Sequence, residues 1–256
     1  MKKLVKGFVM SASMFSIIPL PASFWNDESM PYVVPFFPVV GAGIGGLWYA
    51  FIYLLTTLTD SYIKASFLTA AGIMLFPFLL SGFIHTDGFL DTADAVFSRR
   101  SKEEKLKILK DPNVGAFAAI SLVVLMLVSF CAVFDSLPYL HEPSPVFIFL
   151  PVISRCVSGY ALLVLKPVSE NGYASMFKNG TGARHRTVVL IIAVAALILS
   201  FASGGIKTMA VVLAAAVSGV VSVIFLSKQF GGITGDLCGA AVTFAELAGI
   251  VCFAII

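Results

Sequence analysis

The chain has 256 residues, of which 59% are hydrophobic and 12% are charged. An average soluble domain carries about twice that charged fraction, and a core formed by a chain of this length cannot hide so much apolar surface. The composition therefore excludes an ordinary soluble domain and predicts that a lipid bilayer solvates much of the surface. The formal net charge of +3 is small and gives no reason to expect nucleic acid as a partner.

Apolar segments long enough for a spanning helix, about 20 residues, occur about seven times. Their approximate ranges are 33–55, 65–84, 115–134, 146–165, 187–204, 209–226 and 237–256. We therefore predict an all-α polytopic integral membrane protein, with residues 1–256 forming a single membrane-embedded catalytic domain. The four cysteines lie in apolar stretches without a C-x-x-C pair, so we interpret them as packing residues.

The N-terminal segment 8–20 is apolar but short for a span, and three lysines precede it. A basic stretch followed by a short apolar run partly matches a signal peptide. The same pattern also fits an interfacial or re-entrant segment that does not cross the membrane.

The distribution of positive charge favours the second interpretation. If segment 8–20 does not cross, 14 of the 17 Lys and Arg residues fall on the side of the N-terminus. Lys64 and Lys207 fall on the opposite side, and Arg155 lies within a span. The positive-inside rule then places three loops in the cytoplasm: 86–114, 166–186 and 227–236.

The first of these loops begins with the run HTDGFLDTAD, from His85 to Asp94. The spacing i, i+4, i+7 places Asp87, Asp91 and Asp94 on one face of a helix that continues the preceding span. Three like charges repel one another unless a cation neutralises them, and hard oxygen ligands suit Mg²⁺ or Mn²⁺. The alternative is that the aspartates only cap a helix and solvate a loop. His85 is either a structural hydrogen-bonding residue or a base or phosphate ligand near the metal.

The rest of the predicted cytoplasmic face is basic and rich in glycine. The run from Arg99 to Lys110 predicts an amphipathic helix at the membrane interface. Loop 166–186 carries Lys178 and Arg184 among glycines, which suits phosphate binding but also follows from the positive-inside rule alone. We leave both interpretations open.

The run GGITGDLCG, from Gly231 to Gly239, leads into the last span and places Asp236 where a helix begins. Glycines in such a run let the backbone approach a ligand closely. Glu246 lies deeper in the same span, where an ionisable residue is a functional candidate. Arg155 is its expected partner, either as part of a site or as a purely structural pair.

Four runs, in the same order along the chain, resemble the cobalamin synthase family, the adenosylcobinamide-GDP ribazoletransferases. HTDGFLDTAD is similar to the family's H-x-D-G-x-x-D-T-x-D signature, and KDPNVGAF, from Lys110, is similar to its R-D-x-x-x-G-x-F element. GGITGDLCGA with Glu246 beyond it, and FSIIPLP, from Phe15, complete the match. Lys110 and Lys228 stand where the family has Arg, and Ala95 where it has Gly, while the middle loop matches only loosely.

The resemblance implies a Mg²⁺-dependent phosphotransferase of the bacterial or archaeal cytoplasmic membrane. Its substrates would be adenosylcobinamide-GDP and α-ribazole or its 5′-phosphate, and GMP would leave. The metal ligands would be Asp87, Asp91 and Asp94, while His85, Asp111 and Asp236 would be catalytic. The expected substrate-binding residues are Lys110, Arg155, Lys178, Arg184, Lys228, Gly232, Thr234 and Glu246. We expect the lipid bilayer as a partner, and either homo-oligomers or a complex with other cobalamin-assembly enzymes.

Two other functions remain as alternatives. A CDP-alcohol phosphotransferase also places an aspartate-rich motif at a cytoplasmic helix end, but the A-R that follows its D-G-x-x is missing after Asp87-Gly88. A secondary transporter would place its coupling carboxylates near the membrane midplane. Here only Glu246 is expected at such depth.

Overall fold

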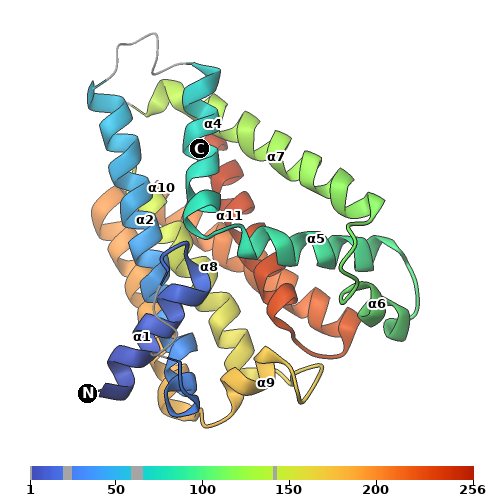
Figure 1. Cartoon of the computed structure of the whole chain (residues 1–256). Helices are drawn as coiled ribbons and strands as arrows, with labels where there is room; N and C mark the ends of the chain where they lie inside the picture. The colour runs from blue at the N-terminus through green and yellow to red at the C-terminus, as the bar shows by residue number, and fades with distance from the viewer. Residues whose placement is uncertain (1, 20–24, 59–65, 141–142) are drawn as a thin grey trace.

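In the computed structural model, the described residues (2–19, 25–58, 66–140 and 143–256) are almost entirely helical. Lys64 and the end of the FSIIPLP run lie outside them. Figure 1 shows the arrangement. The elements in chain order are α1 (Lys2–Phe15), η2 (Asp27–Tyr32), α2 (Val33–Leu58), α4 (Phe67–Leu80), α5 (Ile84–Phe97), α6 (Lys102–Ile108), α7 (Ala116–Ser136), η3 (Leu137–Tyr139), α8 (Val146–Val164), α9 (Tyr173–Lys178), α10 (Ala183–Phe230) and α11 (Gly235–Ile255).

The predicted polytopic helical fold is confirmed. Within the described ranges, five helices are long and apolar enough to cross a membrane, and the bent pair formed by α4 and α5 passes the same test as one span. One of the five, α10, is 48 residues long. A straight helix of that length would measure about 72 Å, more than twice the roughly 30 Å of hydrocarbon in a bilayer. Two of the seven predicted spans therefore have to lie within α10.

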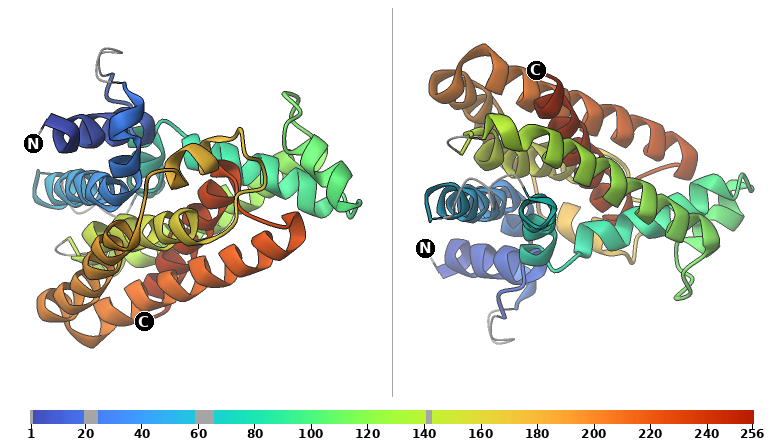
Figure 2. Two further views of the ribbon diagram at one scale, coloured as in Figure 1. Left: turned by 90° about the horizontal axis from the view of Figure 1, so that it is seen from below. Right: turned by 90° about the horizontal axis from the view of Figure 1, so that it is seen from above.

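Gly205 separates these two spans. Its backbone (φ 69°, ψ −162°) is not helical, and this conformation is open to glycine but costly for other residues. Figure 2 shows that the chain doubles back here, so that the arms on either side of the break lie close to α8. The sequence patterns at 187–204 and 209–226 thus correspond to the two arms of α10.

The predicted span 65–84 is shorter in the structure than expected. Helix α4 has 14 residues, about 21 Å of rise, and the chain then bends by 92° into α5. Gly82 (φ 62°) and Phe83 (φ 60°) both adopt the left-handed conformation at the bend. The spacing argument assumed that α5 continues the span, but after the bend α5 packs against α11 and α7.

Helix α1 packs against α2 without being long enough to cross the membrane. It has 14 residues with one buried side, which includes Met10 and Phe15. Helix α1 also approaches η2 closely because residue 7 is glycine, and a Cβ there would lie 2.5 Å from the Cβ of Tyr32. These features fit the interfacial or re-entrant segment predicted from the sequence.

Helix α8 lies at the centre of the bundle and contacts α2, α10 and α11. Of its most apolar 18-residue window, 78% is buried. Two glycines on α2 allow the closest approach. A Cβ at Gly45 would lie 2.5 Å from the carbonyl oxygen of Ile148, and Gly41 lies equally tightly over Pro151. Small residues at helix contacts are the usual means of close packing in membranes.

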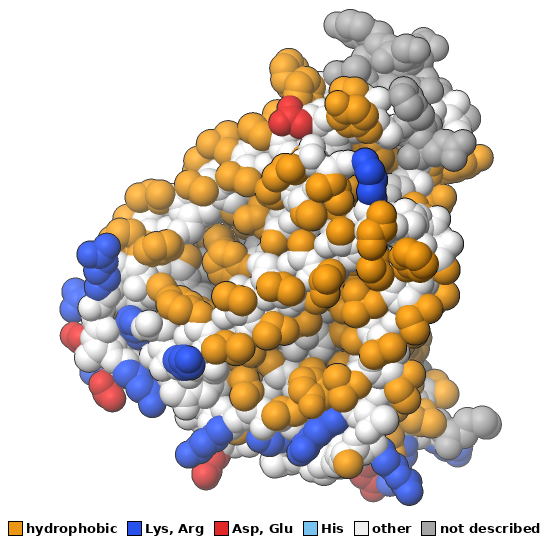
Figure 3. Space-filling model, turned by 180° about the vertical axis from the view of Figure 1, so that it is seen from behind, with side chains coloured by type: hydrophobic (Ala, Val, Ile, Leu, Met, Phe, Trp, Pro, Cys, Tyr) orange, Lys and Arg blue, Asp and Glu red, His pale blue; other side chains and the backbone are white. Residues whose placement is uncertain are grey.

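Apolar and charged side chains occupy different ends of the molecular surface. Figure 3 shows apolar side chains over the middle and upper parts of one face, with Lys and Arg gathered along its lower and left edges. These edges correspond to the end of the molecule that carries α6 and α9. The charged end is the one that the positive-inside rule would place in the cytoplasm.

Candidate active site

Two glycines bring the aspartate-rich helix α5 against the start of α11. A Cβ at Gly88 would lie 2.7 Å from the carbonyl oxygen of Asp236 and 2.9 Å from its Cα atom. On the facing helix, a Cβ at Gly239 would lie 3.3 Å from the backbone of His85. The hydroxyl of Thr243 also donates a hydrogen bond to the His85 carbonyl at 3.2 Å. Because of these contacts, two motifs about 150 residues apart in sequence form one site.

The site contains four carboxylates. Asp87, Asp91 and Asp94 lie on α5, as the spacing predicted, and Asp236 lies in the first turn of α11. Burial raises the pKa of Asp91 to about 6, and the neighbouring negative charges of Asp87, Asp236 and Asp94 add to the rise. Among the described residues, none of these four carboxylates has a Lys, Arg or His partner within salt-bridge distance. The cluster is therefore negatively charged and uncompensated.

The KDPNVG run contacts the side chain of Asp94. Gly115 is the N-cap of α7, and a Cβ at this position would overlap the Asp94 carboxylate. The glycine of the KDPNVG run therefore leaves the space that the Asp94 carboxylate occupies. Asp111 of the same run lies in an exposed turn, where it accepts hydrogen bonds from the Asn113 backbone N–H (2.9 Å) and side chain (2.8 Å). Those bonds lower the pKa of Asp111.

The GGITGD segment connects α10 to α11 through a defined turn. Gly231 is left-handed (φ 73°) and ends α10. Gly232 packs against the backbone of Lys166, whose carbonyl accepts a hydrogen bond from Ile233 at 2.9 Å. Thr234 caps α11 by accepting from the Leu237 N–H. Gly232 and Thr234, predicted to bind substrate, therefore position Asp236 at a helix N-terminus, where negative charge is stabilised.

His85 lies away from the aspartates. Two residues of helix correspond to about 200° of rotation, so its side chain points to the opposite side of α5 from Asp87. It is 8% exposed and packs between Phe15 and Phe37, with ring centroids 6.2 and 5.6 Å away. Its Nε2 is buried without a hydrogen-bond partner among the described residues. The sequence predicts that His85 lies near the carboxylate cluster, but the structure places its side chain on the other side of α5.

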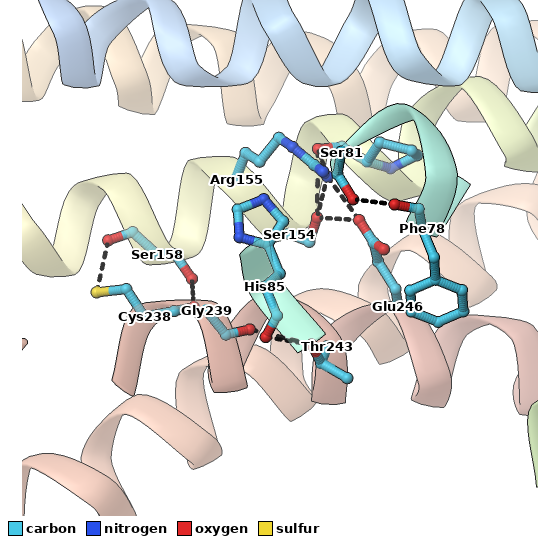
Figure 4. A network of polar contacts seen from close by, with 11 residues as sticks. Phe78, Ser81, His85, Ser154, Arg155, Ser158, Cys238, Gly239, Thr243 and Glu246 are labelled. Carbon is cyan, nitrogen blue, oxygen red and sulfur yellow. Dashed lines mark hydrogen bonds and ion pairs between the residues drawn. The ribbon is translucent and has the colours of Figure 1, made fainter. Parts of the chain in front are cut away.

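Arg155 and Glu246 form the pair expected from the sequence. Arg155 Nη1 donates to Glu246 Oε1 at 2.6 Å, and Ser154 donates to the same oxygen at 2.9 Å. The Arg155 side chain is 1% exposed and that of Glu246 is 14% exposed. Figure 4 shows His85 beside this network, which joins α8 to α11. The pair thus joins α11, which carries Asp236, to the central helix α8.

The predicted cationic residues are not all free to bind a substrate. Lys178 donates hydrogen bonds to the last carbonyls of α8, those of Val164 (3.1 Å) and Leu165 (2.7 Å). Its ammonium group therefore caps a helix. Arg184, Lys110 and Lys228 are exposed.

Sequence reasoning missed Lys102, whose ammonium group lies over Gly231 at the end of α10. The run around it predicts an amphipathic interfacial helix, some of whose charges could attract an anionic substrate, but the pattern singles out no residue within it. The helix there, α6, is also shorter than the predicted Arg99–Lys110. The available signal was the i, i+3 spacing of Lys102 and Lys105, which places both on one face, and Lys105 binds Gln229 on α10 at 2.6 Å.

The carboxylates are close enough to interact but do not form a complete metal site by themselves. In the described part of the chain, no three His, Cys, Asp or Glu side chains lie close enough together to hold a metal ion. Mg²⁺ does not need such a cage, because it usually keeps several waters and binds one or two carboxylates plus substrate phosphates. The oxygen-only donors and their uncompensated charge fit this ion.

Taken together, the fold and the site define a membrane-embedded enzyme with a carboxylate cluster at the charged end of the bundle. The model of the cobalamin-5-phosphate synthase family matches residues 7–254, and the chain belongs to that family. It is similar to the adenosylcobinamide-GDP ribazoletransferase of Clostridium perfringens strain ATCC 13124, with 37% identity over the whole of both chains.

Other relatives with the same name come from Clostridium botulinum strain Alaska E43 and Geobacillus thermodenitrificans strain NG80-2. The first is 38% identical, covering 98% of this chain and 97% of the relative, and the second is 31% identical, covering 96% and 94%. No solved structure matches the chain.

Proposed function

We propose that the chain joins adenosylcobinamide-GDP to α-ribazole or its 5′-phosphate, releasing GMP, at the carboxylate cluster between α5 and α11. The observation that carries the location is the contact of Gly88 with Asp236. It joins two runs that resemble the family's motifs into one uncompensated acidic site. The reaction is the one named for the relatives that match the full length of this chain.

Mg²⁺ is the proposed cofactor, and Asp87, Asp91 and Asp94 would hold it together with waters and the substrate diphosphate. When bound, the ion neutralises the diphosphate and orients it for an in-line displacement. The raised pKa of Asp91 supports this role, because burial and the neighbouring carboxylates disfavour its ionised form, and a bound cation would offset that cost.

The residues of the chain have separate tasks in this reaction. A ribose hydroxyl forms a new bond to the phosphorus attached to cobinamide, and the bond from that phosphorus to the GMP oxygen breaks. We assign Asp236, at the start of α11, as the carboxylate that accepts the proton of the hydroxyl.

We also propose that the charged end of the bundle faces the cytoplasm of a bacterial cell. The concentration of Lys and Arg at that end supports this orientation. It would give the site direct access to soluble nucleotide substrates. Labelling of single engineered cysteines in intact cells would test it, with expected protection at position 110 and labelling at position 207.

Turnover by purified protein in nanodiscs tests the proposed function. Adenosylcobinamide-GDP, α-ribazole phosphate and Mg²⁺ are expected to give GMP and a corrinoid with its lower ligand, and a chelator is expected to abolish both products. Asp87→Asn and Asp91→Asn should each lose activity. The matched control is Asp135→Asn, an exposed aspartate at the end of α7, which should retain it. Wild-type turnover in Asp87→Asn and Asp91→Asn would disprove the site.

A further inference from the structure

A cleft of roughly 400 Å³ lies behind α5, on the side away from the aspartates, between α5, α7, the second arm of α10 and α11. Its walls are almost entirely apolar and include Phe89, Val96, Leu125 and Leu247. A space of this size is too large for the packed core of a folded protein, where voids larger than a water molecule are few. Some apolar group is needed to fill it.

The cleft opens sideways, between two membrane-spanning segments. Val124 on α7 is 55% exposed, and Val221 and Phe225 on α10 are 58% and 48% exposed. In a spanning region these side chains face lipid. In Figure 3 the apolar surface is hollowed on its left half, with Lys and Arg side chains nearby. The position of the opening therefore admits a lipid chain from the bilayer rather than a solute from water.

One end of the cleft is positively charged. Val221, Phe225 and Lys228 follow one another at i, i+4 and i+7 on the same face of α10, so Lys228 lies about 4.5 Å further along the axis than Phe225. From α6, Lys105 reaches Gln229 at 2.6 Å and Lys102 lies over Gly231. None of these three lysines forms an ion pair with an Asp or Glu of the described chain.

A polar group inside the cleft has no partner in the protein. Thr92, on α5, lines the cleft and is 2% exposed. Its hydroxyl is buried without a hydrogen-bond partner among the described residues. A purely apolar ligand would leave this hydroxyl unsatisfied at a cost, whereas a fatty-acid ester offers a carbonyl oxygen that accepts its hydrogen bond.

We propose that the cleft binds one anionic diacyl phospholipid. An acyl chain fills the apolar part, an ester carbonyl accepts from Thr92, and the headgroup phosphate lies among Lys102, Lys105 and Lys228. The lipid would support α5 from the side opposite its aspartates. The proposal does not depend on the reaction that the enzyme catalyses, because it concerns lipid retention rather than turnover.

Native mass spectrometry of retained lipid tests this proposal. The full chain is reconstituted in vesicles with equal amounts of phosphatidylglycerol and phosphatidylcholine and extracted into mild detergent. One phosphatidylglycerol is expected to remain bound, in about a hundredfold excess over phosphatidylcholine, since each of the three lysines near the anionic lipid favours it by roughly fivefold. Equal retention of the two lipids, or of neither, would overturn the proposal.

Two variants locate the lipid. Ser222→Phe fills the cleft and should abolish retention, while the matched control Ser203→Phe, at an exposed position on α10, should not. Lys102→Gln changes only an exposed side chain, so it remains informative if Ser222→Phe does not fold, and it should reduce the preference for phosphatidylglycerol about fivefold. Wild-type retention by Ser222→Phe, or an unchanged preference in Lys102→Gln, would refute the assignment.

Discussion

Replacing either member of the Arg155–Glu246 pair by methionine probes the contact that joins α8 to α11. In Glu246→Met, the Arg155 guanidinium stays 1% exposed but keeps only Pro151 O (3.1 Å) and Ser154 Oγ (3.3 Å) as acceptors. An uncompensated buried charge of this kind costs about 3–5 kcal/mol of stability. Arg155→Met should cost a similar amount, because it leaves the Glu246 carboxylate with only the Ser154 hydroxyl.

The double variant removes both charges and should be much less destabilised than the sum of the single variants. Replacing a whole buried pair by well-packed apolar residues is often close to neutral, so we expect a coupling energy of at least about 2 kcal/mol. The assay is the free energy of unfolding in detergent micelles, measured for all four proteins of the cycle. Single variants within about 1 kcal/mol of wild type, with additive effects, would refute the reasoning.

Three further predictions concern the site. Gly88→Ala should lower the free energy of unfolding by about 1–3 kcal/mol and abolish turnover, because its Cβ would meet the backbone of Asp236. The control Gly46→Ala, which has open space around it, should do neither. Thermal unfolding and GMP release measure the two effects. In chelator, the metal-free protein should become more stable as the pH falls through 6 towards 4, because the raised pKa of Asp91 lets the folded state bind a proton more tightly than the unfolded state. This gain should disappear in unfolding curves of Asp91→Asn, and its persistence there would contradict the assignment. Lys178→Met should cost about 1 kcal/mol of stability through the lost helix cap while leaving KM unchanged; a raised KM at wild-type stability would show instead that Lys178 binds substrate.

The sequence predicted the spans and the grouping of three aspartates on one helix because both depend on local patterns. Apolar length identifies spanning segments, and the i, i+4, i+7 spacing correctly grouped Asp87, Asp91 and Asp94 on one helix. The same helical geometry also separates His85 from Asp87 by about 200°, so its position could have been predicted from spacing. The prediction that His85 lies near the metal was wrong because it assumed that two residues close in sequence are also close in space.

Other features depend on tertiary contacts that no local pattern contains. The 92° bend between α4 and α5 requires left-handed backbone at Phe83, a conformation that a bulky residue adopts only when its surroundings impose it. The role of Gly115 follows from the position of Asp94, which lies on another helix. Lys178 was predicted to bind substrate from its place in a glycine-rich loop. The sequence could not show that it instead binds the carbonyls at the end of α8, because the end of that span can be located only approximately from sequence.

The rate of GMP release by Asp91→Asn, Asp236→Asn and the double variant, at saturating Mg²⁺, tests most directly the claim that α5 and α11 form one catalytic site. If the two carboxylates act as a unit, each single variant should lose nearly all activity and the double variant should be little worse than the poorer single one. Losses that multiply in the double variant, or wild-type turnover in either single variant, would contradict the account.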